Sequence, residues 1–200
     1  MFKKFTKNLC LVLALILTVS SFAACSDLDE MTGGKIDGST DSVASESTVR
    51  QFFEDIQDNE VVPFVLTEKA KTMLSENESL FLENKNEGLE EYTDTSLEYK
   101  VLTKNIDKHG DKLIYLSEAY VLSIDETELD EETTFSELHL VDAAENSFYL
   151  LSLSAYDDVY EGDVVSVYAL PLGETSFENV SGGTTLAIIL AGCYIEKVEG

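Results

Sequence analysis

The spacing of apolar residues changes several times along this chain, and each change marks a different predicted segment. A short apolar run over 9–19 is followed by polar, Gly- and Ser-containing sequence, and then by apolar residues at helical spacing. Later in the chain, branched and aromatic residues gather in runs typical of β-strands. The pattern divides the chain into four parts: 1–24, 25–47, 48–96 and 97–200.

The part over 48–96 is predicted to contain short helices. Thr48 and Gln51 match a capping box, and Thr67 can cap a second helix after Pro63 interrupts the first. Apolar residues three or four positions apart give the first helix one buried face. They are Val49, Phe52, Phe53 and Ile56. We interpret this stripe as core contacts and not as a ligand site.

Five β-strands are predicted in the part over 97–200. Their expected ranges are 112–124, 134–142, 147–156, 163–170 and 184–198. Gly192 is a plausible bulge in the last strand. A long first strand that can bend, followed by four more, predicts a small closed barrel, with a short β-sandwich as the alternative. The predicted fold class is therefore α+β: a small N-terminal helical segment followed by a five-stranded β-barrel.

The first 24 residues have the layout of a secretory signal. Lys3, Lys4 and Lys7 precede the apolar run, and small residues lead directly to Cys25. The run is shorter than the roughly 20 residues that span a bilayer. The sequence before Cys25 resembles the lipobox of bacterial lipoprotein precursors, although Phe22 stands where that motif usually has Leu.

The lipobox resemblance implies that the chain is cut before Cys25 and that Cys25 carries acyl chains such as palmitate. A diacylglyceryl group would anchor the protein stably on the outer face of a cell membrane. Residues 26–47 read as a flexible acidic tether, which fully stretched would reach about 60–70 Å. The alternative is plain secretion, with cleavage after Ala23 or Ala24 and no lipid.

Three segments of the predicted barrel resemble motifs of OB-fold domains. They are EGDVVSVYA over 161–169, YKVLTKNIDKHG over 99–110, and GGTTLAI over 182–188. The last two are similar to the lead-in and the final strand of OB-domain surface lipoproteins of Gram-positive bacteria. Ala169, Ile106 and Ala187 depart from those motifs, where Gly, Pro and Pro are usual. The resemblance covers about 97–200 and implies an OB-like barrel, but it says little about activity, since a fold does not fix a function.

The charge of the chain argues against nucleic acid as a partner. The formal net charge is −26, and Arg50 is the only arginine. OB barrels that bind single-stranded nucleic acid use a basic groove lined with aromatic side chains. The aromatic residues are present in the predicted barrel, but acidic residues far outnumber its lysines, so a phosphate backbone would be repelled.

Residues that could carry chemistry are few. Cys193 would be the only cysteine left after lipidation of Cys25, and His109 and His139 are the only histidines. The spacing of none of these residues forms a recognised catalytic or metal motif. We therefore expect a protein that is not an enzyme and has no cofactor, with Ca²⁺ bound to acidic residues as the alternative.

That hypothesis concerns two acidic clusters expected in loops. One lies between the first and second strands and the other between the third and fourth, and neither has the spacing of an EF-hand. Solvated acidic loops are the simpler interpretation. The candidate ligands are Asp125, Glu126, Glu128, Asp157 and Asp158.

The sequence thus predicts a lipid-anchored, extracytoplasmic OB-type module at the cell surface. It would bind an envelope protein, a glycan or a small ligand, and fold analogy places the contact surface near the first two loops of the barrel. One alternative is a solute-capturing lipoprotein that serves a transporter. A weaker alternative is a hydrolase that acts through paired carboxylates.

Overall fold

The computed structural model describes residues 48–57, 62–131, 133–178 and 182–198. The leader, Cys25 and the tether lie outside these ranges, so the predictions made for them keep the status of predictions. All of the described residues belong to the compact unit that begins at Ser45.

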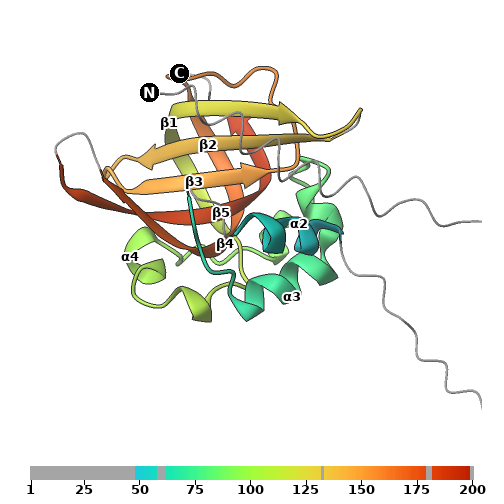
Figure 1. Ribbon diagram of the computed structural model, residues 1–200, viewed down its shortest axis with the longest axis horizontal. Helices are drawn as coiled ribbons and strands as arrows, with labels where there is room; N and C mark the ends of the chain where they lie inside the picture. Colours follow the sequence, from blue (N-terminus) through green and yellow to red (C-terminus); the bar gives the residue numbers. More distant parts are fainter. Residues whose placement is uncertain (1–47, 58–61, 132, 179–181, 199–200) are drawn as a thin grey trace, which may run out of the picture. The chain divides into compact units, whose positions relative to one another are not determined.

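Five strands close into a barrel (Figure 1). Their neighbours follow the order β1-β2-β3-β5-β4, and β4 returns to β1. The pairing of β3 with β5 is parallel, and the other four pairings are antiparallel. The strands are β1 (Ile114–Glu128), β2 (Thr134–Asp142), β3 (Ser147–Ser152), β4 (Val164–Glu178) and β5 (Thr184–Lys197). This closure confirms the expected five-stranded barrel and rules out the sandwich.

The inside of the barrel is filled by the alternating apolar residues of the strands. Val121, Leu138 and Phe148 are all fully buried there. Because successive side chains of a strand point to opposite faces, every second residue supplies this core. Leu97 and Leu102 join the same cluster from the segment before β1. The interior is therefore a packed core and not a channel.

Six short helices precede β1. They are α2 (Thr48–Ile56), α3 (Glu68–Glu76), η1 (Glu78–Phe81), η2 (Leu89–Glu91), α4 (Tyr99–Leu102) and η3 (Ile106–Lys108). The helices from α2 to η2 form a second core against the outer surface of the barrel, whereas α4 contributes Leu102 to the inner core. Phe53 and Leu74 bury their side chains in one cluster with Leu172 and Ile189 of the barrel. Figure 1 shows α2 and α3 on the same side of the barrel. Burial of their apolar faces is what stabilises these short helices, because isolated helices of this length are marginal in water.

The helix starts are stabilised in two ways. The Thr67 hydroxyl accepts a hydrogen bond from the Ala70 amide at 3.2 Å, as the capping prediction required. At α2, Gln51 does not reach back in a capping box; its side chain donates to Asp55 instead. The Val49 amide donates to the Glu78 carboxylate of η1 at 2.8 Å, so a tertiary contact caps this helix.

Strand β1 extends further than the sequence predicted. Asp125, Glu126 and Glu128 belong to β1 and pair with Glu137, Ser136 and Thr134 of β2, so their placement in a loop was wrong. All three acids are exposed, and hydrogen bonding to β2 outweighs their low β-propensity. The connection to β2 is accordingly a short turn.

Strand β4 also extends further, through Pro171. Pro171 faces Leu190 of β5, while the pairing of β4 with β1 ends at Ala169. A proline is tolerated there because only one edge of the strand still carries a partner. The register shifts just beyond it, and the carbonyl of Leu172 accepts a hydrogen bond from the Thr67 amide at 3.2 Å.

Strand β3 ends at Ser152, before the expected residue 156. The chain then turns so that Tyr156 is buried in the inner core, where its hydroxyl donates to Ser152 Oγ at 2.7 Å. In β5 the register shifts between Gly192 and Tyr194, which confirms a bulge next to Gly192, with Cys193 as the additional residue.

Candidate functional site

The ladder of the barrel has a gap along the first part of β1. Strand β1 pairs with β4 from Ile114, opposite Ala169, but with β2 only from Ala119, opposite Asp142. Over Ile114 to Glu118, β1 therefore has a strand partner on one edge only, among the described residues. The pairing with β4 shifts in register over the same stretch, between Leu116 and Ala119.

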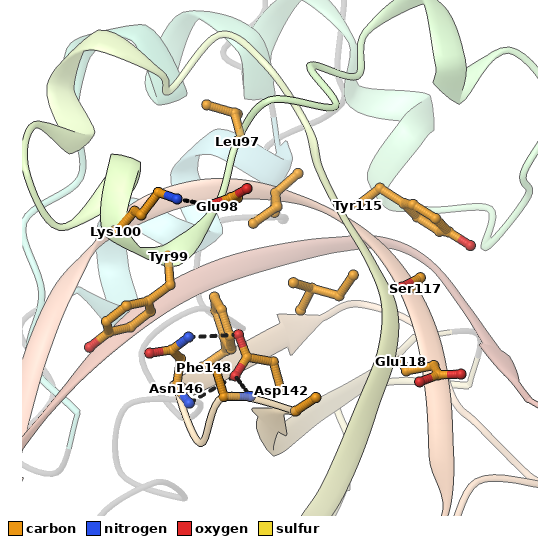
Figure 2. A pocket seen from close by; sticks show the side chains of 14 residues that line it. Leu97, Glu98, Tyr99, Lys100, Tyr115, Ser117, Glu118, Asp142, Asn146 and Phe148 are labelled. Carbon is orange, nitrogen blue, oxygen red and sulfur yellow. Dashed lines mark hydrogen bonds and ion pairs between the residues drawn. The ribbon is translucent and has the colours of Figure 1, made fainter.

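A cleft of about 530 Å³ lies beside this edge (Figure 2). The segment Leu97 to Lys100 forms one wall, β1 forms the opposite wall, and the end of the β2–β3 hairpin closes the lower side as drawn. Small-molecule and peptide sites commonly have volumes of about 300–1,000 Å³. The cleft is therefore large enough to hold a ligand and is formed by three segments that are distant in the sequence.

The hairpin at the cleft is held in shape by one carboxylate. Asp142 accepts hydrogen bonds from the amides of Ala144 and Asn146, both at 2.9 Å, and from the Asn146 side chain at 2.8 Å. Such Asx-type bonds fix a tight turn. Asp142 is thus a structural residue whose acceptors are largely used, while the side chains of the two alanines at the turn remain exposed.

Aromatic side chains line the inner part of the cleft. The rings of Tyr99 and Phe148 meet edge to face, with centroids 5.6 Å apart. The Tyr99 hydroxyl donates to the carbonyl of Leu186 at 2.9 Å, which attaches the α4 segment to β5. Burial, followed by the charges of Glu174 and Asp142, raises the pKa of Tyr99 above its ordinary value. Tyr99 therefore stays neutral and holds the α4 segment against β5.

The opposite wall carries an exposed tyrosine. Tyr115 is 40% exposed and stacks on Tyr168 of β4, its cross-strand partner, with ring centroids 4.4 Å apart. Held flat by its neighbour, the Tyr115 ring offers an amphipathic contact surface that loses little side-chain entropy when a ligand packs on it.

The charged groups around the cleft are mainly acidic. Glu98 pairs with Lys100 at 2.6 Å, so the only lysine of the lining is already neutralised. Glu118 is exposed, and Asp142 adds a further carboxylate at the turn. These groups favour a neutral or positively charged ligand, because an anion would meet an excess of like charge.

The two acidic clusters suggested as Ca²⁺ ligands lie in strand β1 and in the connection between β3 and β4. Glu126 accepts a hydrogen bond from the Tyr156 amide at 2.8 Å and lies 3.0 Å from the Ser136 hydroxyl, so it ties β1 to the β3–β4 connection. Asp157 and Asp158 are exposed in that connection. Within the described ranges, no group of three or more acidic, His or Cys side chains is arranged to hold a metal ion.

The histidines and Cys193 occupy other places. The His139 ring stacks on Tyr149 at 4.6 Å between centroids, and its Nε2 lies 2.7 Å from the Ser147 hydroxyl. Burial lowers the pKa of His139 and raises that of Cys193, which is packed in the outer core. His109 ends the turn η3. None of the three lines the cleft.

No protein-family model, curated protein or solved structure is significantly similar to this chain. None of the helices in the described ranges has the length and apolar character that a membrane crossing requires.

Sequence reasoning did not find this cleft. The β2–β3 turn was one of the two loops expected at the contact surface, and it does line the cleft; the β1–β2 turn does not. One usable signal was the turn from Asp142 to Asn146, which directly follows β2. Strand β2 ends at the point where β1 has no partner on that edge. Recognising it required the register of β1, which the residue pattern alone does not give.

Proposed function

We propose that this chain is a lipid-anchored, extracytoplasmic binding module of the OB type, and that the cleft beside the first part of β1 is its ligand site. The strand order and the parallel β3–β5 pair support the OB assignment, together with the motifs over 99–110 and 161–169. The lipobox resemblance at Cys25 supports the anchor.

The observation that carries the binding role is the position of the cleft. It lies where β1 has a strand partner on one edge only and where Tyr115 is exposed, and it is lined by both polar and apolar side chains. Pockets with a mainly apolar lining and a few fixed polar groups are the usual form of ligand sites. The candidate ligands remain an envelope protein, a glycan or a small molecule.

The anchor is tested with Cys25→Ser in the protein's own host. We expect the wild-type chain in the membrane fraction at high salt and the variant in the medium or the soluble envelope fraction. A variant that stays with the membrane at high salt would disprove the lipid anchor.

The cleft is tested with two matched tryptophan variants. Ala144 is exposed at the cleft, whereas Ala155 is exposed in the β3–β4 connection outside it. Cross-linking on intact cells, followed by purification through a C-terminal tag, should recover an adduct from the wild type and from Ala155→Trp but not from Ala144→Trp. Equal recovery from both variants would show that the cleft is not the site of contact.

A further inference from the structure

We propose that the cleft takes an extended, positively charged peptide segment of another protein, which adds a strand to the free edge of β1. This inference rests on the proposed function, because it specifies the ligand class of the same cleft. It follows from the backbone pairing of β1, from the length of its unpaired edge and from the charged residues around the cleft.

The ladder supplies the main-chain part of the argument. Before the gap, Leu113 exchanges backbone hydrogen bonds of 3.0 Å with Tyr92 and Asp94. After the gap, Ala119 pairs with Asp142 of β2. From Ile114 to Leu116, where the pairing with β4 is regular, successive residues turn their backbone groups to opposite edges, so alternate residues point their N–H and C=O groups away from β4. The register shift between Leu116 and Ala119 interrupts this alternation at the end of the gap. A guest strand would meet these groups in the place that β2 takes further along.

The length of the gap fits a short peptide. The five residues from Ile114 to Glu118 span about 17 Å in an extended strand. A peptide of similar length could lie antiparallel to β1, in line with β2. Its side chains would then alternate between the Tyr115 side of the sheet and the inner part of the cleft, near Tyr99.

The charge selects among the candidate strands. Glu98 is paired with Lys100, while Glu118 and Asp142 leave the cleft with an excess of negative charge on a chain of net charge −26. A lysine- or arginine-containing strand would be attracted, and its approach would be accelerated. A second copy of this chain would bring the same acids to the edge, so its approach would be repelled.

The chain's own segment before residue 48 is also disfavoured by charge. It has a single lysine, Lys35, between Cys25 and Ser47. Its acidic residues are Asp27, Asp29, Glu30, Asp37, Asp41 and Glu46. A basic partner segment is therefore the occupant that the surface favours.

Direct binding to full-length protein in mild detergent tests the proposal. The probe is a capped peptide of seven residues that alternates valine and lysine, measured by calorimetry. Two reference peptides separate the causes: one replaces each lysine by glutamate, and the other keeps the lysines but carries N-methyl groups on alternate backbone amides. We expect the first peptide to bind at least tenfold more tightly than either reference.

Two charge reversals serve as matched variants. Glu118→Lys places a positive charge at the cleft, and Glu161→Lys makes the same change in net charge at an exposed position outside it. We expect at least a fivefold loss of affinity for Glu118→Lys and less than twofold for Glu161→Lys. If Glu118→Lys melts at a lower temperature than wild type, Glu118→Gln replaces it, with Glu161→Gln as its control.

Hydrogen exchange gives a readout independent of affinity. The valine–lysine peptide should slow amide exchange over 114–118 and leave the β1–β2 turn unchanged. Equal binding of the N-methylated peptide, or unchanged exchange over 114–118, would overturn strand addition. Absence of peptide binding, combined with loss of the cellular adduct in Ala144→Trp, would overturn the peptide class and leave the proposed function standing.

Discussion

Glu137 is expected to make this protein less stable as the pH rises towards neutrality. It lies on β2 between Asp125 of β1 and Leu151 of β3. Burial of its carboxyl, and secondarily the charge of Asp125, raises its pKa from 4.5 to about 7. No donor in the described part of the chain offers its carboxylate a hydrogen bond, so ionisation is not compensated.

The sign and size of the effect follow from proton linkage. Below pH 4.5 the folded and unfolded chains both hold the proton. Between pH 4.5 and about 7 the unfolded chain has lost it while the folded chain keeps it, so the free energy of unfolding falls as the pH rises. At about 1.4 kcal/mol for each unit between the two pKa values, the loss reaches about 3–4 kcal/mol at most.

The test compares wild type with Glu137→Gln in urea unfolding at pH 5 and pH 8. Glutamine is similar in shape but cannot ionise, so the variant should lose less stability between the two pH values, by about 1–3 kcal/mol. Glu161→Gln, at an exposed position, is the control for the general effect of removing one negative charge. If Glu137→Gln and Glu161→Gln show the same pH dependence as wild type, the burial argument for Glu137 is wrong.

Two further predictions concern packing. A Cβ added at Gly173 would lie 2.7 Å from the backbone oxygen of Val65, so Gly173→Ala should destabilise the protein by about 1–3 kcal/mol in urea unfolding; an unchanged midpoint would mean that the 62–67 segment yields easily. Cys193 is buried with a raised pKa, so in a Cys10→Ser/Cys25→Ser protein a maleimide should label it only after unfolding, and fast labelling of the folded protein would contradict its place in the core.

The strands differ in how far the sequence could predict them. The range predicted for β2 is the observed one, because apolar and polar residues alternate over Glu137 to Leu140 and the strand ends at turn-forming Asp142. The predicted end of β4 was too early at Leu170, since Pro171 is a local signal against a strand. Only the absence of a β1 partner beyond Ala169 makes that proline acceptable, and this is a property of the closed barrel.

The acidic residues show that local sequence was equally limited in predicting the candidate metal site. Asp125, Glu126 and Glu128 suggested a cation-binding loop, because a run of acids has low strand propensity. Pairing with β2 made them strand residues and gave Glu126 a structural hydrogen bond to the Tyr156 amide. No local pattern contains that information, since the partner lies 30 residues away.

While closure of the strands into a barrel in place of a sandwich was decided by the tertiary structure, the sequence by itself determined the number of β-strands, the cap at Thr67 and the acidic character of the surface. These properties depend on residue type, on spacing over a few positions and on total charge, which can be read along the chain. The tertiary structure alone decided the register of β1, the gap over 114–118 and the cleft beside it. The reason is that strand register is a relation between distant segments, fixed by which side chains can share one core when the barrel closes.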